Sequence, residues 1–361
     1  MSTFQVPVVN IVVGPHPDAD ALEIAQVGAY CSIVRKGQFR TGDMVAYIPE
    51  QSLVPPALLA ELGLTGRLAG PGRDRVKAIR LRGVLSQGLC CPARSGWSVG
   101  QDVAAELGVT KYVPPVPSTM NGTVFSAGLE RTIRYDIENI KRYPDLFTPG
   151  EPVVFTEKVH GTWAQLGVMS PSLAVPDHGR LVVSSKGLAS RGLAFVPDSP
   201  DNLYNVYLRV ARHLDIEARV TSAFGPLAEP VFVLGEVFGA GVQDLGYGAS
   251  TAQDDRLGFR VFDVYRGRRG HGTYLSDAEL DAAVSAMGLQ RAPVVYRGPF
   301  SGEGVRAHTA GRETVSGTGC HLREGVVIRP QVERRDLRIG RAQLKSVSDD
   351  YLLRKGGTEF N

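Results

Sequence analysis

The feature that most constrains this chain is a proline-rich stretch near residue 115. Residues 111–123 read K-Y-V-P-P-V-P-S-T-M-N-G-T, so three prolines fall within four residues. Proline fixes its backbone angle φ and lacks an amide N–H, so this stretch can continue neither a helix interior nor a central strand. With 361 residues, the chain is long enough for two domains of ordinary size. We therefore expect one domain over residues 1–112, a linker over 113–130 and a second domain over 131–361.

The part before the prolines has the pattern of a small all-β domain. Short runs rich in Val, Ile, Tyr and Met occur at residues 6–13, 31–34 and 44–48, and glycine-containing turns separate the last two. Residues 76–82 add a further run, which makes five or so short strands in about 110 residues, as in a small barrel of the OB-fold type.

Residues 76–82 (V-K-A-I-R-L-R) alternate apolar and basic side chains. A strand with this period would direct one face into a core and present Lys77, Arg80 or Arg82 outward. From the pattern alone, this basic face could bind nucleic acid or could simply be solvated.

The part after the prolines mixes helices and strands. Apolar spacing predicts helices over 131–143, 203–213 and 276–287, the last with Ser276 and Glu279 in a capping box. Apolar runs predict strands at 153–155, 162–168, 181–185, 231–237, 259–265, 325–329 and 342–346. Because the two types alternate irregularly, an α+β domain is favoured over a doubly wound parallel sheet.

Composition excludes several classes of protein. The chain has 40 Lys and Arg against 37 Asp and Glu, a net charge of +3, so any binding of nucleic acid needs local basic patches. No apolar run approaches the ~20 residues that span a bilayer, and the N-terminus lacks a secretory pattern. The four cysteines form no C-x-x-C pair, so we expect no structural zinc, no disulfide framework and a reducing cytoplasm.

Two polar stretches follow predicted strands and could bind phosphate. In E-K-V-H-G-T, a turn closed by Gly161 could bring the amine of Lys158 close to a phosphate. In S-S-K-G-L, Lys186 with Arg191 beyond it combines cations, hydroxyls and glycine, which suits the same ligand. Taken alone, each stretch also fits an ordinary polar turn.

Four further residues in predicted strands could take part in chemistry. Glu236 lies in the apolar run L-G-E-V-F-G, where a carboxylate is costly to bury unless it is paired or bound to a cation or a ribose hydroxyl. Glu324 opens the apolar strand E-G-V-V-I-R. Phe262 could stack on a base or belong to the core, and Lys345 could face a triphosphate or the solvent.

The order of these stretches carries more information than any one of them. E-K-V-H-G-T, L-G-E-V-F-G, F-D-V-Y, E-G-V-V-I-R and L-K-S together resemble the motifs of the covalent nucleotidyltransferases, and the form with His160 is similar to that of RNA ligases. In DNA ligases and capping enzymes an OB-fold follows the last motif, whereas here only 361 − 345 = 16 residues follow Lys345. The upstream stretches H-P-D-A-D-A-L-E and K-G-Q-F-R-T-G-D resemble the N-terminal OB module of the Deinococcus-type RNA ligases.

The resemblance implies an α+β nucleotidyltransferase (ligase) domain preceded by a small all-β OB-fold barrel. It implies an ATP-dependent RNA ligase in which Lys158 forms lysyl-AMP, AMP passes to an RNA 5′-phosphate, and a 3′-OH displaces it. The ATP and AMP contacts that it implies are Glu157, Lys158, His160, Gly161, Lys186, Arg191, Glu236, Phe262, Glu324 and Lys345. Glu236 and Glu324 would hold Mg²⁺ or Mn²⁺.

For partners, we expect RNA or an RNA/DNA duplex with a nick, no membrane, and a monomeric protein. A positive neighbour such as Lys345 or a metal ion is expected to lower the pKa of Lys158. Two rival functions stay open: a capping-type or DNA-joining transferase, and a non-catalytic nucleic-acid-binding protein.

Two residues depart from the family pattern. Residue 163 is Trp where phage RNA ligases with this lysine motif carry Asn, so contacts to the 5′-phosphate end differ. The last motif commonly reads K-x-K, but Gln343 stands at the first lysine position, and Arg341 or Lys186 could substitute for it.

Overall fold

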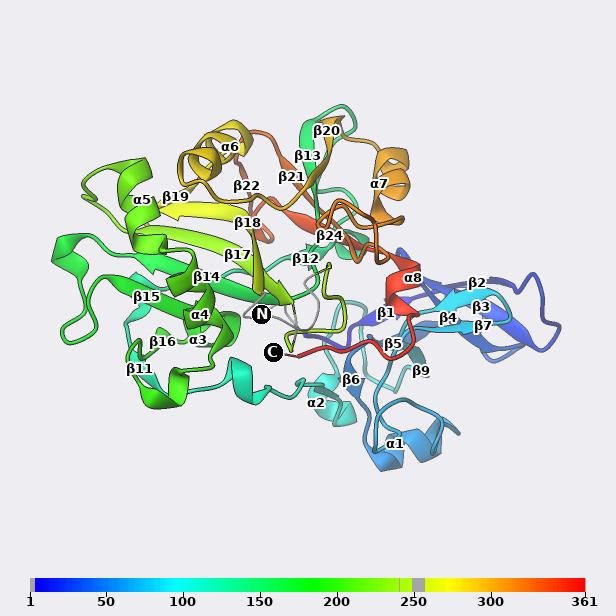
Figure 1. The fold of residues 1–361 in the computed structure, drawn as a ribbon. Helices are drawn as coiled ribbons and strands as arrows, with labels where there is room; N and C mark the ends of the chain where they lie inside the picture. Colours follow the sequence, from blue (N-terminus) through cyan, green and yellow to red (C-terminus); the bar gives the residue numbers. More distant parts are fainter. Residues whose placement is uncertain (1–3, 240, 249–256, 361) are drawn as a thin grey trace. The chain divides into compact units, whose positions relative to one another are not determined.

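The computed structural model describes residues 4–239, 241–248 and 257–360 (Figure 1). The chain forms two compact units. The first unit comprises Met1–Val113 with Lys141–Pro144, and the second comprises Pro114–Ile140 with Asp145–Asn361. A short piece after the proline-rich stretch therefore returns to the first unit.

The first unit is built of short antiparallel strands. One sheet joins β1 (Val8–Asn10), β5 (Met44–Ile48) and β9 (Leu89–Pro92), and another joins β2 (Val12–Pro15), β3 (Leu22–Val27) and β4 (Tyr30–Arg35). Two pairs complete the unit, β6 (Ser52–Leu53) with β10 (Thr110–Lys111) and β7 (Ile79–Leu81) with β8 (Val84–Ser86). The helices α1 (Pro56–Glu61) and α2 (Ala104–Leu107) pack against a core that includes Val8, Ile48 and Trp97.

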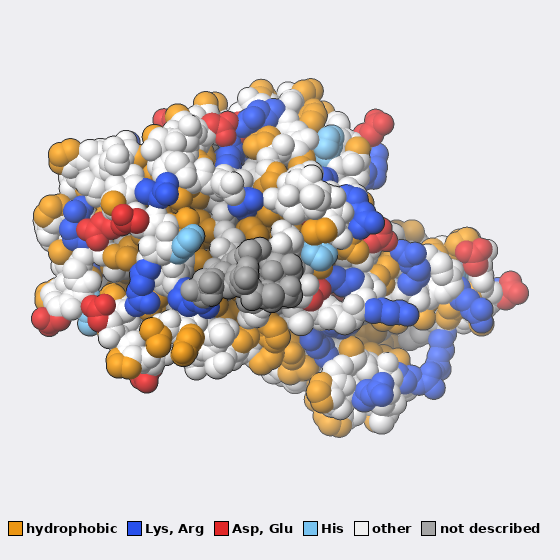
Figure 2. Space-filling view, in the orientation of Figure 1, with side chains coloured by type: hydrophobic (Ala, Val, Ile, Leu, Met, Phe, Trp, Pro, Cys, Tyr) orange, Lys and Arg blue, Asp and Glu red, His pale blue; other side chains and the backbone are white. Residues whose placement is uncertain are grey.

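The predicted basic strand is shorter than expected. Only Ile79–Leu81 is extended, and Ile79, an apolar residue of this run, exposes 48% of its surface. A three-residue strand in a two-stranded hairpin cannot form a buried face of its own, which explains the error. Lys77, Arg80 and Arg82 are all exposed, and Figure 2 shows blue Lys and Arg side chains over the strands β2–β4 and β7 of this unit.

The second unit contains two five-stranded sheets. The first sheet has the antiparallel order β15 (Leu181–Ser185), β14 (Thr162–Val168), β17 (Val231–Gly239), β18 (Leu257–Arg266), β19 (Thr273–Tyr274). The second sheet has the order β12 (Glu138–Asn139), β24 (Leu344–Val347), β21 (Gly325–Pro330), β13 (Pro152–Glu157), β20 (Val294–Pro299). All its pairs are antiparallel except β12 with β24.

Helices cover one face of the first sheet (Figure 1). α4 (Val206–His213), α5 (Ile216–Phe224) and α6 (Asp277–Ala286) share a buried cluster with Leu166 and Val233 of the sheet. Trp163 and Phe232 belong to a second cluster that includes Tyr135. Every residue of β14 is buried as a result.

The remaining elements of the second unit are short. They are the helices α3 (Lys186–Ser190), α7 (Gly302–Thr309) and α8 (Asp349–Leu352), and the strand pairs β11 (Val124–Ser126) with β16 (Leu193–Phe195) and β22 (Arg335–Asp336) with β23 (Gly340–Arg341). Single 3₁₀ turns lie at Ser118–Met120, Leu129–Arg131, Ile140–Arg142, Pro171–Leu173 and Pro200–Asn202.

Most predicted elements of the second unit are confirmed. The strands at 162–168 and 181–185 have the predicted bounds, and the capping box of Ser276 and Glu279 is present. α4 begins later than predicted because the Asn205 side chain accepts hydrogen bonds from the backbone of Tyr207 and Leu208 and so caps the helix there.

The helix predicted over 131–143 is wrong. Ile133 and Tyr135 are both buried while Arg134 between them is exposed, which is the period of an extended chain. The backbone N–H of Ile133 donates to Gln165 Oε1 at 2.7 Å, and β12 pairs with β24. The sequence I-R-Y-D-I fits both periods, and these long-range contacts select the extended form.

The segment after the prolines packs into the second unit. Met120 and Ala127 are each 2% exposed, and β11 pairs with β16. Among the described residues, no helix combines the length and apolar character needed to cross a membrane. All four cysteines are free thiols.

Candidate active site

Lys158 lies in a four-residue turn that joins the two sheets of the second unit. The turn, residues 158–161, connects the end of β13 to the start of β14. The backbone N–H of Lys158 donates to Gly325 O at 2.9 Å, which ties the turn to β21. A side chain at Gly161 would place its Cβ 2.1 Å from Val237 O, so only glycine permits this close approach to β17. The two sheets therefore meet at Lys158.

Two carboxylates flank the lysine. Its ammonium donates to Glu324 Oε1 at 2.6 Å, and Glu324 immediately precedes β21. Glu236 is carried by β17, opposite Trp163 of β14. The Lys158 side chain is 25% exposed, so a ligand can reach it, whereas that of Glu324 is only 8% exposed.

These neighbours raise the pKa of Lys158. Burial favours the neutral amine, but the negative charges of Glu324 and Glu236 more than offset burial, so the pKa is raised. The expected lowering, which included the charge of a metal ion, is therefore not produced by the side chains alone. A nucleophilic lysine must lose its proton, so binding must supply positive charge or draw the carboxylates away.

Burial also disfavours the charged forms of Glu236 and Lys345, the other charged residues of this cluster. Burial raises the pKa of Glu236 to about 8, with Lys158 opposing the change and Glu324 adding to it. Burial also lowers the pKa of Lys345, on β24, to about 8, and the positive charges of Lys158 and Lys186 lower it further. Groups with pKa values displaced toward neutrality in this way cluster at functional sites.

The carboxylates fit a hard divalent cation. Glu324 Oε2 is buried and accepts no hydrogen bond, so a lone pair is available there. Carboxylate oxygens are the ligands that Mg²⁺ and Mn²⁺ prefer. No group of three or more His, Cys, Asp and Glu side chains in the described part of the chain could hold a metal by itself. Water or phosphate oxygens would therefore complete the coordination, as is usual for Mg²⁺.

Both candidates to substitute for the absent lysine at position 343 make ion pairs, and the ammonium of Lys186 lies 3.8 Å from Asp136 Oδ1. The guanidinium of Arg341 is bound to Asp263 and Glu333 and stacks 3.8 Å from the centre of the Tyr274 ring. Lys186 begins α3, directly after β15, and its charge acts on both Glu236 and Lys345.

Gln343 itself is engaged in the core. It is 3% exposed, and its Oε1 accepts a hydrogen bond from the Tyr135 hydroxyl at 3.2 Å.

The remaining predicted residues have contacts of their own. Glu157 is buried and accepts hydrogen bonds from the backbone and the hydroxyl of Thr314, both at 2.7 Å. Phe262 packs with its ring centre 5.2 Å from that of Tyr135. Arg191 donates to Gly187 O at 3.2 Å, at the end of α3.

His160 is 5% exposed and contacts groups far away in the sequence. Its ring nitrogens lie 2.8 Å from Asp244 Oδ1 and 2.8 Å from the Tyr351 hydroxyl. Asp244 and Tyr351 were not predicted as site residues. They lie outside the motif stretches, and no local spacing indicates them.

Comparisons with known proteins identify the family and the fold. An RNA ligase family model matches residues 151–347, and an OB-fold domain model matches residues 6–93. Among solved structures, the RNA ligase of Naegleria gruberi with PPi is 20% identical with a TM-score of 0.74, covering 97% of this chain and 98% of that one.

A variant of the same enzyme with ATP and Mn is 20% identical with a TM-score of 0.74, covering 96% of this chain and 97% of that one. Another variant, with AMP and Mn, is 19% identical with a TM-score of 0.72 over the same shares. No curated protein matches the chain. Since the RNA ligase model spans more than half of the residues, this chain belongs to the RNA ligase family and carries an OB-fold domain before its ligase domain.

Proposed function

We propose that this protein is an ATP-dependent RNA ligase that joins a 3′-OH end to a 5′-phosphate end. The observation that carries the proposal is the meeting of Lys158 with Lys186, Lys345 and two carboxylates at the junction of the two sheets. The similar Naegleria structures contain ATP, AMP, PPi and Mn, which supports a nucleotide as the ligand of this site.

In the first step, the Lys158 amine attacks the α-phosphorus of ATP. A nitrogen–phosphorus bond forms, the bond to the β-phosphate oxygen breaks, and pyrophosphate leaves. The ammonium first loses a proton to solvent, which reaches the exposed quarter of the side chain. Lys345 and Lys186 would neutralise charge on the phosphate oxygens, the main task of a protein in phosphoryl transfer.

Glu236 and Glu324 would hold a divalent cation, either Mg²⁺ or Mn²⁺. When bound, the cation supplies positive charge next to the phosphates and next to Lys158. With that charge present, the two carboxylates would no longer raise the pKa of the lysine, and a larger fraction of it would be the free amine.

In the second and third steps, AMP passes to RNA and is then displaced. The 5′-phosphate of the RNA attacks the phosphorus of lysyl-AMP, which returns the amine of Lys158 and leaves a 5′-adenylylated end. The neighbouring 3′-OH then attacks the 5′-phosphate, forms the phosphodiester bond and releases AMP. The rate of this last step depends chiefly on the alignment of the attacking 3′ oxygen with the phosphorus.

We propose a nick in an RNA or RNA/DNA duplex as the substrate, sealed by a monomer in the cytoplasm. The exposed Lys77, Arg80 and Arg82 of the first unit would contact the phosphate backbone. His160 and the upstream OB-fold module both resemble features of RNA ligases, so RNA is expected on the 3′-OH side of the break. A 2′-OH is the group by which a protein distinguishes RNA from DNA at one position.

A labelling experiment separates the ligase from its rivals. The wild-type protein is incubated with ATP or GTP labelled at the α-phosphate, with Mg²⁺ or Mn²⁺, and is then denatured. Label retained from ATP supports the proposal, and label only from GTP indicates capping chemistry. No label from either nucleotide identifies a non-catalytic binding protein and overturns the proposal.

A second experiment tests the nucleic acid. Splinted nicks carry either ribose or deoxyribose in the last nucleotides on the 3′-OH side, with the 5′-phosphate strand unchanged. Faster sealing of the ribose substrate is expected. Equal rates would contradict RNA specificity and favour a DNA-joining enzyme.

A further inference from the structure

The residues after the last strand of the ligase domain pack against the lysine turn. The family model ends at residue 347, and we call residues 349–360 the C-terminal segment. This segment begins with α8 and continues to Phe360, and it contacts both residues 241–248 and the turn at 158–161. None of the sequence motifs includes it.

Asp244 is the centre of these contacts. Its carboxylate accepts hydrogen bonds from Arg354 Nε at 2.9 Å and Nη2 at 3.1 Å, and from the backbone of Thr358 at 2.8 Å. Burial favours the neutral acid, but the hydrogen bonds from His160 and Arg354 hold the pKa of Asp244 well below its usual range. Asp244 is therefore a charged acceptor that links the C-terminal segment to His160.

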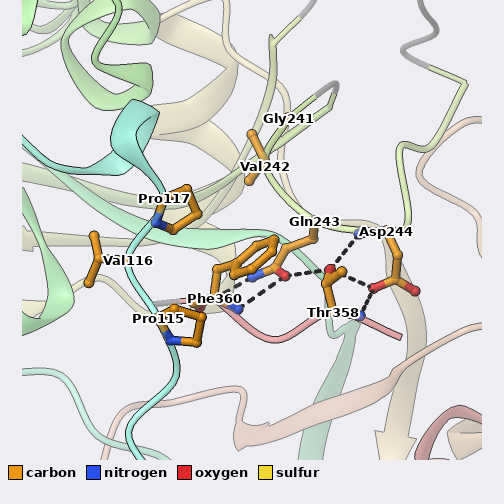
Figure 3. A pocket seen from close by; sticks show the side chains of 9 residues that line it. All are labelled: Pro115, Val116, Pro117, Gly241, Val242, Gln243, Asp244, Thr358 and Phe360. Atoms are coloured by element: carbon orange, nitrogen blue, oxygen red, sulfur yellow. Dashed lines mark hydrogen bonds between the residues drawn. The ribbon is translucent and has the colours of Figure 1, made fainter. Parts of the chain in front are cut away.

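Gln243 makes a second link beside it (Figure 3). Its amide Nε2 donates to Gly161 O at 3.1 Å and to Phe360 O at 3.2 Å, and its Oε1 accepts from the Thr358 hydroxyl at 2.9 Å. The Phe360 ring lies with Pro115, Pro117 and Val242 around a cavity of about 390 Å³. The end of the segment thus holds the last residue of the lysine turn through a single side chain.

The imidazole of His160 is fixed from two sides. His160 Nε2 lies 2.8 Å from Asp244 Oδ1 and 3.2 Å from Arg354 Nη2, and His160 Nδ1 lies 2.8 Å from the Tyr351 hydroxyl. The backbone N–H of His160 also donates to the Tyr247 hydroxyl at 2.7 Å. Neither the ring nor the backbone of the residue two positions after Lys158 can turn without breaking these bonds.

We propose that the C-terminal segment positions the lysine nucleophile, with Asp244 and Arg354 as positioning residues that act through His160 and Gly161. One end of the turn is anchored to β21 by the backbone of Lys158, and the other end is anchored by this segment. A nucleophile displaced by about 1 Å can lose on the order of 100-fold in rate. This role rests on the proposed function, because it concerns the formation of lysyl-AMP.

The position of the lysine turn matters for one step of the reaction in particular. Lys158 attacks phosphorus only when lysyl-AMP forms, whereas sealing of an RNA that already carries a 5′-adenylate uses the 3′-OH as nucleophile. Loosening the turn should therefore slow the first step much more than the last. Loss of folded protein would reduce both steps equally.

The test compares two arginines with similar hydrogen-bond partners. Arg354 binds a carboxylate with two nitrogens, donates to two backbone carbonyls and lies 3.7 Å from the centre of the Tyr351 ring. Arg334 lies away from the turn and also binds a carboxylate, that of Glu151, with two nitrogens and donates to Leu146 O, but its side chain is 35% exposed against 10% for Arg354. Arg354→Ala, Arg354→Lys, Asp244→Asn and the control Arg334→Ala are measured for single-turnover lysyl-AMP formation, for sealing of a pre-adenylylated nick, and for melting temperature.

We expect Arg354→Ala and Asp244→Asn to form lysyl-AMP about 10- to 100-fold more slowly, with sealing of the pre-adenylylated nick within about twofold of wild type. Arg354→Lys, which keeps the charge, should recover part of the rate, and Arg334→Ala should be normal in both steps. Equal loss in both steps by the Arg354 variants, or equal first-step rates for Arg354→Ala and Arg334→Ala, would overturn the positioning role. If the wild-type protein forms no lysyl-AMP, the ligase proposal itself fails, a result that the wild-type lane alone reveals.

Discussion

The two units of this protein carry positive charge in opposite ways. In the second unit, Lys158 and Lys345 are surrounded by other charges, and burial displaces the pKa of Glu236 beside them. In the first unit, Lys77, Arg80 and Arg82 are exposed around a two-stranded hairpin. Buried charges act strongly over a few ångströms, whereas exposed charges act weakly and are screened by salt. The buried charges of the second unit suit chemistry on one phosphate, whereas the exposed charges of the first unit suit contact with many phosphates.

The largest expected effect is the loss of the nucleophile. Lys158→Ala should abolish retention of label from α-labelled ATP while circular dichroism shows a folded protein, because the lysine lies in a turn and not in the core. Lys158→Arg should fail as well, since a guanidinium stays protonated and cannot attack. Lysyl-AMP formed by either variant would show that another residue carries the nucleotide.

The next largest effect is expected at Lys345, where one substitution should raise stability and abolish activity. The pKa of Lys345 is about 8 in the folded protein and ~10.4 in an unfolded chain, so the folded state loses this proton first as pH rises. Below pH 8, holding the charged amine in this site lowers the free energy of unfolding, and this cost disappears between about pH 8 and 10.4. Lys345→Met should therefore raise the melting temperature at pH 7, lose this advantage near pH 10, and fail to form lysyl-AMP.

Lys36→Met provides the control for that experiment. Lys36 is exposed in the first unit, so the same change of side chain there should alter neither lysyl-AMP formation nor the dependence of melting temperature on pH. If Lys345→Met raised the melting temperature by the same amount from pH 7 to pH 10, the cost of holding the charged Lys345 amine could not be the cause of the gain.

A third pair of variants tests which cation replaces the lysine absent at position 343. Lys186→Ala should raise the KM for ATP about tenfold with little change in melting temperature, because the lysine faces the charged cluster from the start of a short helix. Arg341→Ala should instead destabilise the fold by about 3–5 kcal/mol, since it leaves Asp263 in the core without one of its partners. If Arg341→Ala changed the KM and left stability intact, the two roles would be reversed.

The sequence indicated which charged residues meet at the candidate site, but not which residues surround them. Lys158, Glu236, Glu324 and Lys345 lie in short stretches whose order is informative, so their meeting could be anticipated. The partners of His160 could not be, because Asp244 and Tyr351 are 84 and 191 residues away from it and belong to no motif. These contacts form only when distant segments pack together in the folded protein, so they produce no periodic pattern in the sequence.

The errors in the fold have one physical cause. Residues 131–143 and 76–82 were both assigned from local period alone. In the first case, the hydrogen bond from Ile133 to Gln165 and the pairing of β12 with β24 override helical spacing. In the second, the hairpin has too few strands to bury its apolar side. The effect of the side chains on the pKa of Lys158 could not be predicted for a related reason, since the distance to Glu324 follows from tertiary structure.

The smallest expected effect concerns the exposed charges of the first unit. Each phosphate contact that is lost should reduce by about 1 the slope of the logarithm of the RNA-binding constant against the logarithm of salt concentration. The triple variant Lys77→Ala, Arg80→Ala, Arg82→Ala should therefore bind a nicked duplex more weakly at low salt and approach wild-type affinity as salt rises. Arg94→Ala is the control, because Arg94 is also exposed in this unit but lies outside the β7–β8 hairpin, 2.9 Å from Glu61. Its removal takes away a single charge, so it should change the slope less than one third as much. An unchanged slope in the triple variant would mean that these side chains are merely solvated. The exposed charges of the first unit would then have no role in binding, and we would expect the duplex to bind to the ligase domain.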